Sequence, residues 1–220
     1  LMEVKGMNHT LNSYLGNRSF LKKFLMIAMP IAIQNGITNF VSMLDNLMVG
    51  QLGTHQMNGV SIVNQIAFIP YLALFGAMAG AGIFTAQFYG SGNNEGIKYT
   101  FRFKLCIGAL VVSGAIFTVC FWGRELISLF LHSESRNDIE LTMQYGLDYL
   151  SVIMWSFIPF GLCQIYVSTL REVGQTVVPM KAGLVAVVVN VVMNWVLIFG
   201  KFGLPAMGVK GAALATIFAR

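Results

Sequence analysis

Long apolar stretches recur along the chain and are separated by short polar connections. A helix that crosses a bilayer needs about 20 consecutive, mostly apolar residues. Five stretches reach that length and a sixth begins near Met207; the five run over residues 24–50, 60–89, 105–122, 149–170 and 177–199. The pattern predicts an all-α polytopic membrane protein, a single six-helix bundle whose sixth helix is truncated at Arg220.

The composition supports a bilayer as the solvent. Of the 220 residues, 56% are hydrophobic and 10% are charged, whereas soluble domains carry about 25% charged residues. This excludes secreted disulfide scaffolds, nucleic-acid-binding modules and soluble enzymes. We expect residues 1–23 to form a cytoplasmic N-terminal segment and residues 24–220 to form the transmembrane lobe.

The positions of the basic residues predict the orientation, because loops rich in Lys and Arg stay on the cytoplasmic side. The N-terminal segment and the connections on the same side hold most of the basic residues, namely Lys5, Arg18, Lys22, Lys23, Lys98, Arg102, Lys104, Arg171 and Lys181. The connections on the other side hold fewer, namely Arg124, Arg136, Lys201 and Lys210. We therefore expect a multi-pass protein of the cell (plasma or inner) membrane with a cytoplasmic N-terminus, surrounded by lipids and without a nucleic-acid partner. No Lys or Arg is expected deep inside the five complete spans.

A polar stripe runs along the first span. Polar groups in hydrocarbon are costly and normally face a cavity or another helix. Steps of three and four residues place most of the stripe on one helical face. It is formed by Gln34, Asn35, Thr38, Asn39, Ser42, Asp45 and Asn46. We interpret it as a cavity lining; hydrogen bonding between packed helices is the alternative.

Asp45 is the acid of this stripe, flanked on both sides by apolar sequence. It lies roughly 8 to 12 Å inside an outer boundary placed at Gly50 to Gly53, at about 1.5 Å of rise per residue. Desolvation at that depth favours a bound proton or cation on the carboxylate. The alternative is a solvated helix end.

The fifth and sixth spans carry polar residues at a similar depth. Asn190 and Asn194 are four residues apart and share one helical face, and Thr216 follows in the sixth span. Carboxylate, amide and hydroxyl oxygens are the ligands that hard cations prefer. Asp45, Asn190, Asn194 and Thr216 are therefore the predicted cation-binding residues, and interhelical hydrogen bonding is the alternative.

Further polar and small residues mark the second and fourth spans. Asn64 and Gln65 near the outer end of the second span, and Gln164 in the fourth, are predicted to extend the cavity. Gly76 and Gly80 form a GxxxG pattern, which favours close helix packing. Pro159 is expected to bend the fourth span.

Motifs for catalysis are absent from the sequence. It contains neither the HExxH pattern of zinc enzymes nor a Walker A motif for nucleotides. We expect no enzymatic activity and no organic cofactor. Transport by this chain would be driven by an ion gradient, with H⁺ or Na⁺ as the coupling ion.

Three segments resemble the multidrug and toxic compound extrusion (MATE) family. They read AMPIAIQNGITNFVSMLDNLMVGQLG, STLREVGQTVVPMKAG and NVVMNWVLIFGKFGLPAMGVKGAALAT, in the family's order. The resemblance implies the first of two six-helix lobes of a cation-coupled antiporter that exports amphipathic or cationic small molecules by alternating access. The C-terminal lobe of the same protein would be its partner.

The resemblance also implies roles for individual residues. Asp45 matches the acid that binds H⁺ or Na⁺ in the first helix, Asn190 the first polar position of the fifth, and Thr216 the hydroxyl of the sixth. Asn194 stands where many members have Asp, so the coupling ion stays open between H⁺ and Na⁺. Alternatives are a lipid-linked saccharide flippase, which needs a strongly cationic cavity, and a non-transporting membrane subunit or fragment.

Overall fold

The computed structural model describes residues 18–131 and 136–220. Their ordered elements are all helical. They are α2 (Arg18–Gly50), α3 (Thr54–Gly90), α4 (Asn94–Ser128), α5 (Arg136–Ile153), the short 3₁₀ helix η1 (Met154–Ser156), α6 (Phe157–Glu172), α7 (Val177–Phe199) and α8 (Gly208–Phe218). The all-α fold predicted from the hydrophobic pattern is confirmed.

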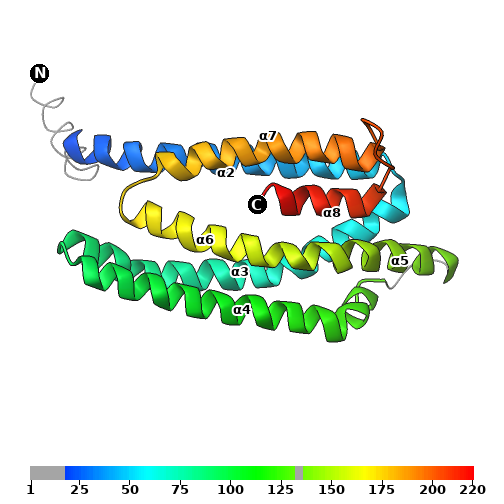
Figure 1. The fold of residues 1–220 in the computed structure, drawn as a ribbon, viewed down its shortest axis with the longest axis horizontal. Helices are drawn as coiled ribbons and strands as arrows, with labels where there is room; N and C mark the ends of the chain where they lie inside the picture. Colours follow the sequence, from blue (N-terminus) through cyan, green and yellow to red (C-terminus); the bar gives the residue numbers. More distant parts are fainter. Residues whose placement is uncertain (1–17, 132–135) are drawn as a thin grey trace, which may run out of the picture.

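The helices lie roughly side by side along the long axis of the lobe (Figure 1). α2 packs on α7 at one edge and α3 packs on α4 at the other, while α8 and the rod of α5, η1 and α6 lie between them. In the described residues, five helical spans are long and apolar enough to cross a membrane, with α5, η1 and α6 counted as one. Successive connections fall at alternate ends of the bundle, as a polytopic membrane protein requires.

The helices are longer than the apolar stretches that predicted them. The third span was expected over residues 105–122, whereas α4 covers Asn94–Ser128. Charged and polar residues at its start continue the helix beyond the apolar run, which hydropathy alone does not detect. Because of this extension, Lys104 lies within α4 and not in the connection before it.

Lys104, which was counted among the bases of the cytoplasmic connections, instead lies inside α4 and is completely buried. Its side chain has no exposed surface, and Nζ donates to Glu172 Oε2 at 2.5 Å. Nζ also donates to Ser168 Oγ at 3.2 Å and to Thr169 Oγ1 at 3.3 Å. The three ammonium donors thus have partners on α6, which offset the cost of burying the charge.

The fourth span changes helix type shortly before Pro159. Proline lacks the N–H that would bond to the carbonyl of Trp155 four residues earlier. The chain tightens there into the 3₁₀ turn Met154–Ser156 between α5 and α6. The structure thus has a local 3₁₀ segment just before Pro159, in the span where a bend was expected.

Close helix contact is made by different glycines from those of the GxxxG pattern. A Cβ added at Gly76 or Gly80 would meet no other heavy atom within 4 Å. At Gly59 it would lie 2.8 Å from the backbone nitrogen of Gly146 and 2.9 Å from the carbonyl oxygen of Thr142. The packing prediction for Gly76 and Gly80 is wrong within this lobe, and α3 instead approaches α5 at Gly59.

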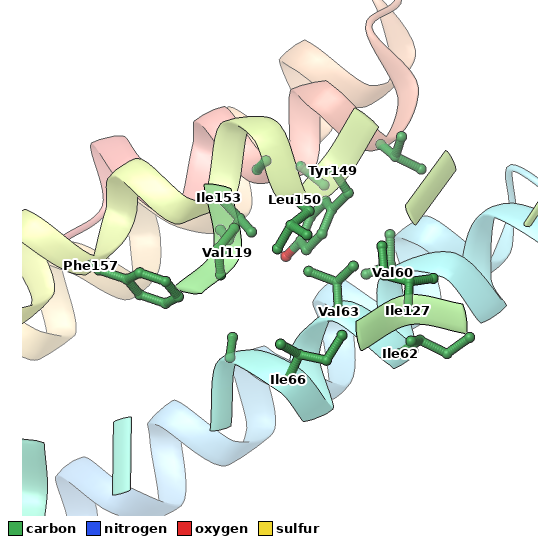
Figure 2. Close-up of a cluster of buried hydrophobic side chains, with 14 of the residues drawn as sticks. Val60, Ile62, Val63, Ile66, Val119, Ile127, Tyr149, Leu150, Ile153 and Phe157 are labelled. Atoms are coloured by element: carbon green, nitrogen blue, oxygen red, sulfur yellow. The ribbon is translucent and has the colours of Figure 1, made fainter. Parts of the chain in front are cut away.

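The apolar core lies among α3, α4 and α5 (Figure 2). Val63, Ile127, Leu150 and Ile153 are buried side chains of this cluster. Tyr149 belongs to it as well, and its hydroxyl donates to Asn64 Oδ1 at 3.3 Å. The core therefore holds in place the α3 and α5 side of the polar cavity that Asn64 and Tyr149 line.

A tight turn after α7 reverses the chain, so that the next helix, α8, packs back against α7. Gly200 adopts a left-handed conformation with φ of 66°, which glycine adopts without the steric cost of a Cβ. Farther along, the N–H of Met207 donates to the carbonyl of Leu197 at 3.0 Å. α8 thereby packs against α7, which brings Thr216 toward the cavity beside Asn194.

Candidate cation and substrate site

Asp45 of α2 meets Asn194 of α7 at the interface of these helices. Asn194 Nδ2 donates to Asp45 Oδ1 at 2.6 Å. Asn194 is 1% exposed, and Asp45 is only partly exposed. A carboxylate and an amide that are 149 residues apart in sequence are therefore in direct contact.

The side-chain amide of Asn190 completes the cluster and fits two protonation states of Asp45. One end of the amide lies 2.9 Å from Asp45 Oδ1 and 3.3 Å from Oδ2. With nitrogen at that end, Asn190 donates to an ionised carboxylate. With oxygen there, it accepts from Asn194 Nδ2 at 3.2 Å and is placed to accept from a protonated Asp45, because an amide oxygen only accepts hydrogen bonds.

A cavity of about 520 Å³ opens beside this cluster. Thr216 lines it with Asp45 and Asn194, and the Thr216 hydroxyl donates to the carbonyl of Ala212 at 3.0 Å, which leaves lone pairs on Oγ1. Other polar residues of its lining are Asn39, Ser42, Asn46 and Asn64. A smaller neighbouring cavity of about 170 Å³ also contains Asp45 and Thr216 and is lined by Thr38, Ser42 and Asn190.

Several predicted cavity residues lie elsewhere. Neither cavity that contains Asp45 is lined by Gln34, Asn35, Gln65 or Gln164. Gln34 Oε1 instead accepts from Arg171 Nη2 at 2.7 Å, which links α2 to the end of α6. Gln164 lines a separate cavity of about 250 Å³ with Ser168 and Glu172. Asn35 and Gln65 are exposed side chains.

Arg220 and Tyr71 are among the lining residues of the larger cavity that the sequence pattern did not indicate, and Phe160 packs on Arg220 beside them. Arg220 lines the cavity, and its guanidinium carbon lies 4.7 Å from the ring centre of Tyr71 and 4.4 Å from that of Phe160. A signal for Arg220 was present in the sequence, because it follows Thr216 by four residues in the expected sixth span, although α8 itself ends at Phe218. The two aromatic residues carried no comparable signal, since aromatic side chains are common throughout the chain.

The arrangement places a carboxylate that can hold a small charged species beside a volume large enough for an organic molecule. A partly buried carboxylate bordered by amides and a hydroxyl can hold a proton or a hard cation. The adjoining volume has the size of small-molecule sites and combines polar groups with apolar and aromatic side chains such as Phe68 and Tyr71. The described residues contain no cluster of three His, Cys, Asp or Glu side chains that would hold a transition metal.

These features define a polytopic helical membrane lobe with a polar cavity around one carboxylate. The MatE family model matches residues 30–196. The chain belongs to the MatE family, as the resemblance of its three segments indicated.

Curated relatives carry multidrug-resistance names. A probable multidrug resistance protein NorM of Thermotoga maritima is 29% identical over 200 residues, which are 90% of this chain and 42% of the relative. A probable NorM of Bacillus subtilis is 28% identical over 200 residues, which are 90% of this chain and 43% of the relative. The chain thus spans about two fifths of the length of these relatives.

Solved structures share the fold. A crystal structure of MATE in the bent conformation superposes with a TM-score of 0.76 at 20% identity and covers 90% of this chain and 42% of the other. An outward-facing multidrug resistance MATE family transporter gives a TM-score of 0.73 at 19% identity, with the same coverage. The helices described here therefore have the arrangement found in part of these larger proteins.

Proposed function

We propose that this chain is the N-terminal lobe of a cation-coupled antiporter that exports amphipathic or cationic drugs and toxic compounds by alternating access. The contact between Asp45 and Asn194 beside the 520 Å³ cavity carries the proposal. Family membership and coverage of about 42% of the NorM relatives support a second, C-terminal lobe as the partner of this one. The lobe acts in transport, and no catalytic step is assigned to it.

The proposed coupling ion is H⁺. The nitrogen of the Asn194 amide faces the carboxylate, whereas a Na⁺ ion needs oxygen ligands at that position. A proton requires only the amide of Asn190 to turn, so that its oxygen, rather than its nitrogen, faces a protonated Asp45 at 2.9 Å. Na⁺ binding would additionally require the amide of Asn194 to turn, so that an oxygen faces the ion. The observed orientation of Asn194 therefore favours proton coupling.

Protonation of Asp45 would alter the α2–α7 contact. An ionised Asp45 accepts from both amides, whereas the protonated group donates to Asn190 and leaves a weaker acceptor for Asn194. Such loading shifts an equilibrium between two lobe conformations only through different affinities in the two states. The α2–α7 interface is the proposed place where the states differ, and substrate is released as Asp45 is loaded.

The proposed membrane orientation places the N-terminus in the cytoplasm. The α3–α4 and α6–α7 connections lie at the same end of the bundle as the start of α2 (Figure 1). Arg18, Lys98 and Lys181 lie near this end, in agreement with the positive-inside pattern. Lys5 and residues 1–17 of the proposed cytoplasmic segment lie outside the described residues.

The flippase alternative is less well supported. The buried Lys104 is paired with Glu172, away from the cavity. The cavity itself contains Arg220 together with Asp45. One base opposite one acid does not provide the strongly positive cavity that a pyrophosphate headgroup requires.

The test uses the complete two-lobe protein in proteoliposomes. An imposed proton gradient without Na⁺ is expected to drive uptake of a fluorescent cationic dye into inside-acidic vesicles. Asp45→Asn is expected to abolish the dependence on the gradient, because the amide does not take up a proton at this site. Asp148→Asn is the matched control, since Asp148 pairs with Lys210 at 3.1 Å on a half-exposed surface.

Two results would contradict the proposal. Gradient-driven transport that is unchanged in Asp45→Asn would remove the role of this carboxylate. Transport driven by a Na⁺ gradient alone, with no response to the proton gradient, would retain the antiporter and reject H⁺ as its coupling ion.

A further inference from the structure

An apolar groove of about 430 Å³ lies between α4 and α6. It is lined by one glycine of each helix, Gly108 of α4 and Gly161 of α6. A Cβ added at Gly108 would lie 2.9 Å from Ile165 Cδ1, and one added at Gly161 would lie 2.9 Å from Val112 Cγ2. The two glycines therefore allow the helices to approach closely and leave the groove beside them unfilled.

This groove is separate from the cavity that contains Asp45. The helices that line the cavity are α2, α3, α5, α7 and α8, whereas α4 and α6 line the groove. α4 lies at the edge of the lobe away from α2 and α7 (Figure 1). Both α4 and α6 belong to helical spans that are long and apolar enough to cross a membrane. The groove thus lies at the depth of lipid acyl chains and outside the proposed transport path.

Arg102 lies on the face of α4 that borders the groove. Leu105 and Ala109, which line the groove, follow Arg102 by three and seven residues, and this spacing places the three on one helical face. At about 1.5 Å of rise per residue, Arg102 lies ~4.5 Å before Leu105 along the helix axis. The apolar run of α4 begins at Leu105, so the exposed side chain of Arg102 is placed at the level of the lipid headgroups.

The neighbouring residues suit the same level of the membrane. Lys98 lies one turn before Arg102 and forms an exposed pair with Glu95 at 2.8 Å. The ring of Phe101 packs on that of Tyr166 of α6, with the ring centres 5.3 Å apart, and Tyr166 is 56% exposed. Tyrosine is enriched at the membrane–water interface, because its ring is apolar and its hydroxyl is polar. This end of the groove therefore combines a positive charge with an interfacial aromatic residue.

We propose that Arg102 and the α4–α6 groove bind an anionic phospholipid, with the phosphate on the guanidinium and one acyl chain in the groove. The guanidinium fork matches the oxygens of a phosphate. The groove residues from Leu105 to Ser113 span ~12 Å along α4, close to the ~15 Å of hydrocarbon in one leaflet. In the proposed orientation this end of the lobe faces the cytoplasmic leaflet, which contains anionic lipids. The site adds a lipid partner to the lobe and does not depend on antiport.

Two other occupants of the groove make different predictions. General contact with bulk lipid would not distinguish one headgroup from another. A second protein lobe seated on α4 and α6 would keep every lipid out of the groove. The experiment therefore varies the headgroup, the charge of Arg102 and the shape of the groove separately.

The probes are phosphatidylglycerol and phosphatidylcholine that carry the same photoreactive diazirine in one acyl chain. A trace of either probe is added to phosphatidylcholine nanodiscs that contain the complete two-lobe protein, and mass spectrometry identifies the labelled peptides. Peptides of α4 and α6 that border the groove are expected to be labelled about fivefold more by phosphatidylglycerol, the size of the effect of one basic residue near a lipid surface.

Substitutions test the charge and the groove. Arg102→Gln is expected to abolish the preference for phosphatidylglycerol, whereas Arg102→Lys should keep part of it, because an ammonium group still attracts a phosphate. Arg124→Gln, at another exposed arginine of α4, is the control for charge. Ala109→Phe fills the groove and should lower labelling by phosphatidylglycerol to the level of phosphatidylcholine. Thr118→Phe adds a ring at an exposed residue of α4 that does not line the groove and is the control for size.

Three results would overturn the lipid site. Equal labelling of the groove peptides by the two probes in the wild type would show bulk lipid contact only. No labelling of these peptides by either probe would show that protein covers the groove. A preference that persists in Arg102→Gln or in Ala109→Phe would show that the guanidinium or the groove does not bind the lipid. Dye transport by the wild type tests antiport independently, so each of these results leaves the proposed function standing.

Discussion

Lys104 Nζ lies 2.5 Å from Glu172 Oε2 and joins α4 to α6 through a pair in which the lysine has no exposed surface. Ser168 and Thr169 accept the other two hydrogen bonds of the ammonium group. The pair lies toward the end of the lobe at which α6 finishes, away from the Asp45 cavity. It therefore joins α4 to α6 at the end of the lobe opposite the Asp45 cavity.

Glu172→Gln is expected to destabilise the lobe by about 3 to 5 kcal/mol, because it leaves the buried charge of Lys104 without its counterion. The free energy of unfolding in mixed micelles measures this. Glu95→Gln makes the same change in an exposed pair with Lys98 and should cost less than about 1 kcal/mol. Equal losses in the two variants would show that the buried pair has no special role.

Gly59→Ala is expected to cost about 1 to 3 kcal/mol through overpacking. The added methyl group would meet backbone atoms of Gly146 and Thr142 on α5, at 2.8 and 2.9 Å, and these atoms have no rotamers to change. Gly114→Ala is the control, since nothing lies within 4 Å of its Cβ position. The control should be neutral or slightly stabilising, because alanine favours the helix over glycine. Unfolding midpoints of the two variants that coincide would contradict the close α3–α5 contact.

The hydrophobic pattern predicted the helices but not which apolar faces form the core. Leu110 is 71% exposed and Val112 is 9% exposed, although both are aliphatic residues of α4. Lipid and protein interior are equally apolar, so hydropathy does not separate the two environments. The same limit explains why Gly76 and Gly80 were predicted to allow close helix packing, whereas Gly59 makes the close contact of α3.

The polar residues were more informative than the apolar ones. Helical spacing and depth were sufficient to group Asp45, Asn190, Asn194 and Thr216, which the structure brings around adjoining cavities. Spacing within one helix did not show where its polar face turns away from the cavity, so Gln34 was included although it bonds to Arg171. The roles of Asp45, Asn190, Asn194 and Thr216 in cation binding remain predictions, which the experiments above test.

Gln34→Leu is expected to lower the stability of the lobe by about 1.5 to 3 kcal/mol, the range for a hydrogen bond to a charged group. Arg171 Nη2 would lose its acceptor at 2.7 Å, while Arg171 Nε already has none in the described structure. Gln65→Leu makes the same change at an exposed position and should be nearly neutral. The melting temperatures of both variants in nanodiscs provide the comparison, and a neutral Gln34→Leu would contradict the α2–α6 link.

Asn194→Asp is expected to convert the site toward Na⁺ binding. The substituted carboxylate would face Asp45 across the 2.6 Å contact that the amide now makes. Two carboxylates at that distance repel each other. Either they share a proton, or a cation bound between them lets both stay ionised. The second acid also replaces the amide nitrogen by an oxygen ligand, which a hard cation prefers.

The measurement is thermal stabilisation of the complete protein by NaCl relative to KCl at equal ionic strength, since a ligand that binds the folded state raises its stability. Asn194→Asp is expected to bind Na⁺ at least about tenfold more tightly than the wild type, a difference of ~1.4 kcal/mol. Asn46→Asp adds the same charge at an exposed residue of the same cavity and should give a smaller gain. Equal gains in the two variants would mean that cavity charge alone attracts Na⁺, and that the contact between α2 and α7 does not hold the ion.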